Sequence, residues 1–217
     1  MEKIDVKEYL KIFSDKLMIP ASGEVFVENE KIRLCVVKES EKQDYIALSY
    51  TYSCMKSAFK DEEFLEDLWN GFLNGKSFIC TVYDQKTGDY VGYCAIKDIE
   101  RPDWELAIEL RPEWCHKGYG TEAVSLFLKR LAKITGKHSF RTRVATDNYA
   151  SQALMKKLGA SPNGVSQFLL REEALEEFRR ENQDMIDDRF RKLADEFGVE
   201  PEEMLGMVLE YQLDVKE

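Results

Sequence analysis

Two glycines stand close together where a strand-like run gives way to a helix-like one, and this feature constrains the fold most. The stretch reads Cys-His-Lys-Gly-Tyr-Gly-Thr-Glu-Ala-Val, residues 115–124. Residues 104–110 before it alternate as a strand does, and residues 121–134 place apolar side chains at helical spacing. Glycine permits close approach to the backbone, and a helix start offers unpaired N–H groups and a positive dipole end. The pattern predicts a phosphate site.

Two common phosphate-binding motifs are absent from the chain. A nucleotide-binding loop needs G-x-x-x-x-G-K-[ST], which does not occur. The dinucleotide fingerprint G-x-G-x-x-G fails because residue 123 is alanine and because the strands before it form hairpins. From the residues alone, a turn with a purely structural role explains the two glycines as well as a phosphate site does.

Alternation and turn residues predict a sheet whose first strands are antiparallel. Residues 77–84 and 89–99 flank Gln-Lys-Thr-Gly, which is typical of a hairpin turn. Further strands are predicted over 31–38, 104–110, 139–146 and 164–170, and helices within 41–73, over 121–134 and from Asn148 to Leu158. The chain is therefore predicted to be an α+β protein.

The C-terminal segment differs from the rest in charge. From residue 171 onward there are 7 basic and 16 acidic residues, which accounts for most of the net charge of −10. Its apolar side chains fall on one helical stripe, and Pro201 suits the start of a second short helix that carries Leu205, Val208 and Leu209. Such a stripe is predicted to pack on the body of the same chain, with a homodimer partner as the second candidate.

Composition excludes several classes of protein. The net charge makes nucleic acid a poor partner, and no apolar run approaches the roughly 20 residues of a membrane span. The charged N-terminus does not resemble a secretory signal, so a cytoplasmic protein is expected. Five cysteines without C-x-x-C spacing and only two histidines make a metal site improbable. The predicted division is an N-terminal helical extension over 1–30, a central domain over 31–170 and an acidic helical extension over 171–217.

Two motifs in order resemble the GNAT superfamily of acyl-CoA-dependent N-acetyltransferases. IELRPEWCHKGYGTEAV (108–124) resembles the family's pyrophosphate loop, and VATDNYASQALMKKLGA (144–160) resembles its Asn-led helix. The resemblance covers about residues 31–170. It implies a mixed, mostly antiparallel central sheet flanked by helices, in which the strands at 104–110 and 139–146 part to leave an acyl slot. Within the superfamily the chain is most similar to the branch that includes acetyltransferases of ribosomal-protein N-termini.

The resemblance implies a set of coenzyme-binding residues. Main-chain N–H groups of the loop would hold the pyrophosphate of acetyl-CoA, and backbone groups near Leu110 would pair with the pantetheine arm. Asn148 would bind pantetheine or only cap its helix. One departure from the family pattern is a cysteine where arginine or glutamine is usual; a nucleophilic role for it would need a ping-pong route, which is unusual in this family. The loop residues implied are Cys115, His116, Lys117, Gly118, Tyr119, Gly120 and Thr121.

Candidate catalytic residues follow from the chemistry of amine acetylation. A protonated amine must lose a proton before it attacks a thioester, and a carboxylate can take that proton. Glu105 and Glu109 share one face of their strand, and Glu105 is the first choice because related sequences often have Glu there. The tyrosine that often protonates the leaving thiolate is replaced by Met155, so Tyr149 or Ser151 is the substitute considered.

The predicted function is direct transfer of an acetyl group from acetyl-CoA to a primary amine of a small molecule or of a peptide or protein N-terminus. The alternative is a non-catalytic module that binds acyl-CoA as a sensor or scaffold, which the replacement at Met155 and the acidic tail favour. Neither motif identifies the amine acceptor.

Overall fold

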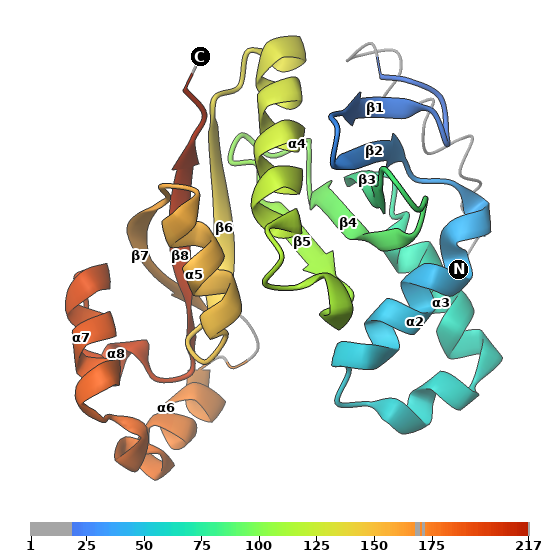
Figure 1. Ribbon diagram of the computed structural model, residues 1–217. Helices are drawn as coiled ribbons and strands as arrows, with labels where there is room; N and C mark the ends of the chain where they lie inside the picture. The colour runs from blue at the N-terminus through green and yellow to red at the C-terminus, as the bar shows by residue number, and fades with distance from the viewer. Residues whose placement is uncertain (1–18, 168–169, 171, 217) are drawn as a thin grey trace. The chain divides into compact units, whose positions relative to one another are not determined.

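The computed structural model describes residues 19–167, 170 and 172–216, and the chain forms two compact units (Figure 1). The first unit spans Met1–His138 with Val215–Glu217, and the second spans Ser139–Asp214. The predicted helix near residues 6–17 lies outside the described residues. The predicted division into 1–30, 31–170 and 171–217 stays a prediction.

The first unit is built on an antiparallel sheet in which sequence neighbours are also spatial neighbours. Its strands are β1 (Val25–Glu28), β2 (Ile32–Val36), β3 (Phe78–Asp84), β4 (Tyr90–Ile96) and β5 (Leu106–Leu110). Each strand pairs antiparallel with the next, and β3 and β4 form the hairpin that their turn residues predict. Among the described residues, β5 is an edge strand of this sheet.

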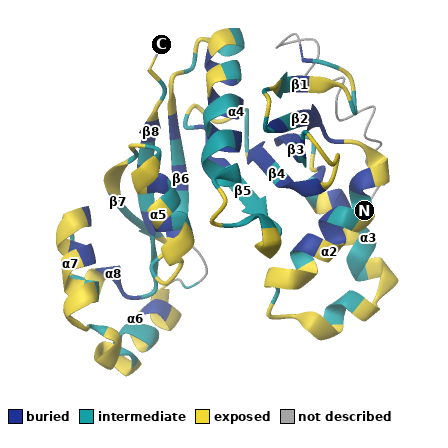
Figure 2. Ribbon diagram, in the orientation of Figure 1, coloured by how far each residue is buried: buried dark blue, intermediate teal, exposed yellow. Residues whose placement is uncertain are grey.

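Helices cover both faces of this sheet. They are α2 (Lys42–Tyr52), α3 (Glu62–Phe72) and α4 (Tyr119–Thr135). On one face Phe127 of α4 stacks on Phe78 of β3, with ring centroids 5.8 Å apart. On the other face Phe72 of α3 meets Tyr93 of β4 at 4.9 Å. Figure 2 shows the central strands and the inner sides of these helices as buried, which marks the core.

The predicted helical stretch over residues 41–73 contains two helices. Helix α2 ends at Ser53, whose backbone is extended, and a short 3₁₀ turn follows at Lys56–Lys60. Helix α3 then begins after Asp61, whose side chain accepts a hydrogen bond from the Glu63 N–H. An N-cap aspartate in the middle of the stretch therefore restarts the helix.

The second unit pairs a small antiparallel sheet with short helices. Its strands are β6 (Ser139–Ala145), β7 (Ser161–Gln167) and β8 (Met207–Asp214), in the spatial order β6-β8-β7. Its helices are α5 (Tyr149–Lys157), α6 (Glu172–Glu181), α7 (Asp188–Phe197) and α8 (Pro201–Met204). Phe197 of α7 packs edge-on against Tyr211 of β8, with ring centroids 5.0 Å apart.

The prediction of a second C-terminal helix carrying Val208 and Leu209 was wrong. Helix α8 begins at Pro201 as predicted but ends at Met204, and strand β8 follows. Leu209, Tyr211 and Leu213 alternate as buried residues, which is the period of a strand. Strand β7 begins earlier than predicted, at Ser161, and Val25–Glu28 is a strand within the segment predicted to be a helical extension.

Candidate active site

The Gly-x-Gly turn forms an open loop that ends in the first turn of α4. His116 and Gly118 adopt left-handed backbone conformations, with φ of 58° and 81°. Within the described part of the chain, no backbone carbonyl accepts from the N–H groups of His116, Lys117 or Gly118. The N–H groups of the first helical turn have no intrahelical partner either. These donors, together with the positive end of the helix dipole, make a site for an anion.

Gly118 is required by this loop for two reasons. Its φ of 81° is strained for any residue with a side chain, and a Cβ there would lie 3.2 Å from Lys31 Nζ. Gly136, at the other end of α4, also has a positive φ of 71°, but a Cβ there would meet nothing within 4 Å. Close approach to the backbone is therefore specific to the loop end of the helix.

Lys31 is a basic residue at the loop that sequence reasoning missed. Its Nζ donates a hydrogen bond to the Lys117 carbonyl at 2.7 Å and lies 4.5 Å from the centroid of the Tyr119 ring. Tyr119 in turn donates to Asp84 Oδ2 at 2.5 Å. These contacts fasten the loop to the start of β2 and the end of β3. Lys31 is 86 residues before Lys117, so no local pattern links them.

The hydrogen bond between Tyr119 and Asp84 sets the protonation of both groups. It raises the pKa of Tyr119 to about 12, so the hydroxyl stays a donor. The same bond, followed by that from the Thr87 backbone, lowers the pKa of Asp84 below its ordinary value. The contact is therefore a charge-assisted bond that holds the loop in place.

Strand β5 leads directly into this loop, and alternate backbone groups at its end point away from β4. The bonds from Lys97 N to Glu105 O and from Arg111 N to Val91 O show that odd-numbered residues face β4. Backbone groups of Ile108 and Leu110 consequently point away from β4. The Leu110 carbonyl already accepts a bond from the Tyr52 hydroxyl at 2.8 Å, and that hydroxyl lies 3.9 Å from Cys115 Sγ.

The two candidate carboxylates share a face of β5, as predicted, but have different partners. Glu105 is buried, and its Oε1 lies 2.7 Å from Lys97 Nζ. Glu109 is half-buried, and among the described residues its hydrogen bond comes from the Tyr93 hydroxyl at 3.0 Å. Desolvation raises the pKa of the Glu109 carboxyl above its ordinary value, and the bond from Tyr93 opposes that rise.

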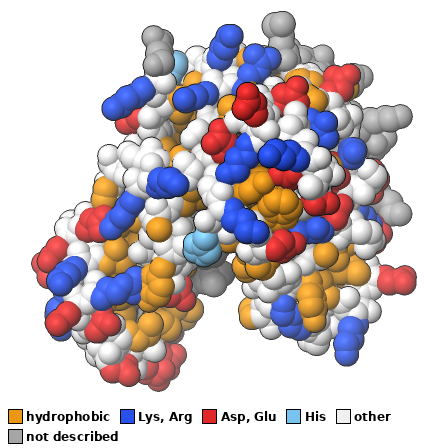
Figure 3. Space-filling view, viewed as in Figure 1, with side chains coloured by type: hydrophobic (Ala, Val, Ile, Leu, Met, Phe, Trp, Pro, Cys, Tyr) orange, Lys and Arg blue, Asp and Glu red, His pale blue; other side chains and the backbone are white. Residues whose placement is uncertain are grey.

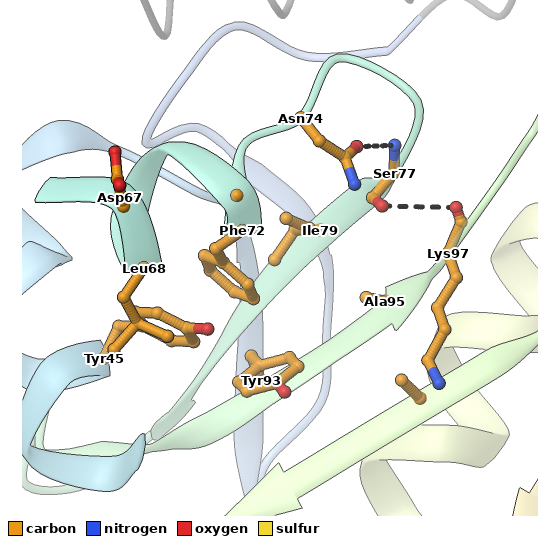
Figure 4. Close-up of a pocket in the computed structure, with 12 residues that line it drawn as sticks. Tyr45, Asp67, Leu68, Phe72, Asn74, Ser77, Ile79, Tyr93, Ala95 and Lys97 are labelled. Carbon is orange, nitrogen blue, oxygen red and sulfur yellow. Dashed lines mark hydrogen bonds between the residues drawn. The ribbon is translucent and has the colours of Figure 1, made fainter. Parts of the chain in front are cut away.

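A cavity of about 380 Å³ lies against this same face of the sheet (Figure 4). Tyr45, Phe72 and Tyr93 form its aromatic wall, and Ala95 and Ala107 belong to its floor. Tyr93 donates to Glu109 and Lys97 pairs with Glu105. Each candidate carboxylate is thus bonded to a residue that lines the cavity.

The remaining candidates lie in the second unit. Asn148 Oδ1 accepts a hydrogen bond from Ser151 N at 3.0 Å, so the N-cap role is present. Tyr149 is exposed, and the guanidinium of Arg189 lies 3.5 Å from its ring centroid. Met155 is buried. The roles of Asn148, Tyr149 and Ser151 in coenzyme binding or catalysis stay predictions.

The described residues contain neither a metal-binding cluster nor a membrane-spanning helix. Within residues 19–167, 170 and 172–216, no group of three or more His, Cys, Asp or Glu side chains could hold a metal ion. None of the described helices is long and apolar enough to cross a bilayer. On the face seen in Figure 3, basic and acidic side chains are interspersed with hydrophobic ones.

Comparison with protein families decides what kind of domain carries this loop. A family model for the acetyltransferase (GNAT) domain matches residues 33–161, which is more than half of the chain. The chain belongs to the GNAT acetyltransferase family. The resemblance drawn from its two motifs is therefore confirmed, and so is the mixed, mostly antiparallel fold.

Solved structures with a similar fold include several acetyltransferases. RimL, a ribosomal-protein alpha-N-acetyltransferase in complex with coenzyme A, is 12% identical, with a TM-score of 0.61 over 88% of this chain and 98% of that one. A ribosomal-protein-alanine acetyltransferase from Vibrio fischeri is 14% identical, with a TM-score of 0.57 over 88% and 97%. A spermidine N-acetyltransferase from Vibrio cholerae, in complex with CoA and spermine, is 14% identical, with a TM-score of 0.56 over 86% and 97%.

At such identities these likenesses show the fold of the GNAT domain alone. A search of curated protein sequences found no significant match to the chain. The fit of the domain to CoA therefore depends on its own loop, where Gly118 and the unpaired N–H groups leave room and donors for a diphosphate.

Proposed function

We propose that this GNAT domain transfers an acetyl group from acetyl-CoA directly to a primary amine, either of a small molecule or of a peptide or protein N-terminus. One observation carries the proposal: a single strand, β5, ends in an anion-binding loop and carries a desolvated carboxylate beside a cavity. Such an arrangement brings a thioester and an amine to the same strand.

The loop and the end of β5 that leads into it would hold the coenzyme. N–H groups from His116 to Thr121, with Lys31 and Lys117 nearby, suit the diphosphate, whereas the Cys115 N–H already donates to the Pro112 carbonyl. Backbone groups of Ile108 and Leu110 suit the pantetheine amides, which would add to the sheet edge as a further strand. Bound acetyl-CoA supplies the activated thioester. Asn148, on the second unit, is proposed as an additional contact.

Glu109 is the better placed of the two carboxylates to act as general base. Glu105 is already paired with the Lys97 ammonium, which stabilises its charged form and makes it a weaker base. Among the described residues, Glu109 accepts its hydrogen bond from a neutral hydroxyl rather than from a cation, and its raised pKa makes it a stronger base than Glu105. Glu109 removes a proton from the amine, whose nitrogen then bonds to the acyl carbon as the carbon–sulfur bond breaks.

The CoA thiolate is a good leaving group, so protonation by an acid is less important for it than removal of a proton is for the amine. Met155 cannot donate a proton, and Tyr149, Ser151 or water is proposed in its place. Cys115 Sγ lies 3.6 Å from the Arg111 carbonyl, which is a contact for a thiol rather than for a thiolate nucleophile. Direct transfer is therefore preferred to a route through an acylated cysteine.

Titration calorimetry with CoA tests the loop, and an acetyl-transfer assay tests the chemistry. Gly118→Val is expected to weaken CoA binding by about tenfold or more, because it adds both backbone strain and bulk. Gly136→Ala is the matched control, since it also strains a positive φ at an end of α4 but faces open space. Equal affinity of the two variants for CoA would contradict the placement of the diphosphate in this loop.

The assay also separates the enzyme from a non-catalytic CoA-binding module. Turnover with any primary amine, lost in Glu109→Gln, supports the enzyme. Tight CoA binding with no turnover on a panel of monoamines, polyamines and peptides would favour the module. The cytoplasmic location and the homodimer stay predictions.

A further inference from the structure

Small side chains, rather than a gap between elements, create the cavity on the α3 face of the sheet. Ala95 and Ala107 are direct partners across β4 and β5 and form adjacent parts of the floor. On the same face they are flanked by larger residues, since side chains two apart on a strand share a face. On α3, Gly71 lines the cavity, and a Cβ there would meet nothing within 4 Å. The space is therefore specified at three positions where a larger side chain would fill it.

The wall of the cavity is a cluster of aromatic rings. Tyr45 and Phe72 are stacked, with centroids 3.8 Å apart, and Phe72 meets Tyr93 edge-on at 4.9 Å. Figure 4 shows Phe72, Tyr45 and Tyr93 gathered on one side, with Ala95 to their right. Packed rings of this kind bind apolar or aromatic groups, and their faces attract a cation.

Among the residues that the structure describes, few charged side chains line the cavity, and the one cation among them is paired with a carboxylate. Lys97 is engaged by Glu105 at 2.7 Å, and the acidic lining residue Asp67 is exposed. Glu109 is not among the residues that line the cavity, but its carboxylate accepts a hydrogen bond from the hydroxyl of Tyr93, which does line it, and desolvation raises its pKa. A polyamine would need several carboxylates, and a peptide would need polar partners for its backbone groups. One amine beside one carboxylate fits this lining.

We infer that the acceptor is a small monoamine whose primary amine is attached to an apolar or aromatic body, with Ala95, Ala107 and Gly71 setting its size. This inference rests on the proposed function and specifies the substrate class of the same site. The cavity volume of about 380 Å³ is near the lower end for ligand sites, which favours a small molecule. The body lies over the paired alanines against the rings, and the amine points to Glu109.

The test compares acetyl transfer to 2-phenylethylamine, spermidine and a tripeptide with a free N-terminus, using the full chain. We expect kcat/KM for 2-phenylethylamine to exceed that for spermidine and for the tripeptide by about tenfold or more. Gly71→Leu fills the cavity from α3 and also improves helix propensity, so it is expected to fold while losing about tenfold or more in kcat/KM. Ala95→Val is a second, smaller filling of the floor. Glu63→Gln, on the exposed side of α3, is the control expected to leave transfer unchanged.

The outcomes separate the substrate class from the function itself. Faster transfer to spermidine or to the tripeptide, unaffected by Gly71→Leu, would overturn the monoamine assignment and leave the acetyltransferase standing. If no amine is acetylated, binding of 2-phenylethylamine to the CoA-loaded protein is measured by calorimetry. Saturable binding that Gly71→Leu abolishes would support the cavity as a monoamine site although the proposed function fails. Absence of binding would overturn it.

Discussion

Glu105 directly precedes strand β5 and Glu109 lies near the end of that strand, and a comparison of the two shows how the surroundings of a glutamate determine its role. At the first end, Glu105 is buried and fixed by Lys97 at 2.7 Å. At the other end, where the strand runs into the loop, Glu109 receives a neutral hydroxyl at 3.0 Å and has a raised pKa. A carboxylate paired with an ammonium stabilises the fold, whereas one bonded to a neutral hydroxyl is better suited to exchange a proton.

The largest expected effect is on the rate of transfer. Glu109→Gln should lower kcat by about a hundredfold or more, because it removes the base but keeps the size and one acceptor. Glu105→Gln should lower it by less than about tenfold, because that carboxylate is held by Lys97. Steady-state kinetics on both variants checks this. A larger loss of kcat in Glu105→Gln than in Glu109→Gln would indicate that Glu105 is the base.

The pH dependence of kcat/KM should report the same difference. The base must be ionised, so activity is present above the Glu109 pKa and is lost as pH falls through it. Since desolvation raises this pKa, the loss should begin at a higher pH than for an ordinary glutamate, whose pKa is about 4.3. Glu105→Gln should keep this acid limb. An acid limb that stays in Glu109→Gln, measured on its residual activity, would contradict the assignment.

Stability should respond in opposite directions at the two ends. Glu105→Gln leaves Lys97 without its partner and should lower the free energy of unfolding by about 1–2 kcal/mol at neutral pH. The Glu109 pKa is raised in the folded state, so its ionisation destabilises the protein as pH rises through that value. Glu109→Gln should therefore raise the unfolding temperature at pH 7, with the difference vanishing below about pH 4. Urea and thermal unfolding at both pH values measure this.

The smallest expected effect concerns the loop end of the strand. Lys31→Met removes a charge and the bond to the Lys117 carbonyl and should weaken CoA binding by about threefold. The effect should shrink as salt concentration rises, because the ammonium acts on the diphosphate by charge. Lys86→Met, in the β3–β4 turn, is the control. No change in affinity at low salt would limit Lys31 to holding the loop.

Most helices and strands of the first unit could be predicted from the sequence because the patterns that specify them are local. Hairpin turns, strand alternation and two glycines before α4 each lie within a few residues of the structure that they specify. Alternation also placed Glu105 and Glu109 on one face of β5. It could not supply their partners, since Lys97 and Tyr93 depend on the pairing of β4 with β5. The ranking of the two carboxylates therefore needed the structure.

The second unit shows where local patterns are ambiguous. Leu205, Val208 and Leu209 fit the spacing of a helix, while Leu209, Tyr211 and Leu213 fit the alternation of a strand. The segment forms strand β8 because pairing with β6 and β7 gives its backbone groups hydrogen-bond partners along both edges. Lys31 was missed for a related reason, since its contact with Lys117 joins distant parts of the chain.

The strand order β6-β8-β7 has a consequence for how the protein is made. Ser139 in β6 pairs with Asp214 in β8, and β7 pairs with β8 from its other side. As the chain leaves the ribosome, β6 and β7 both emerge before the strand that joins them. The edges of β6 and β7 that pair with β8 therefore lack their partner strand until translation has delivered β8.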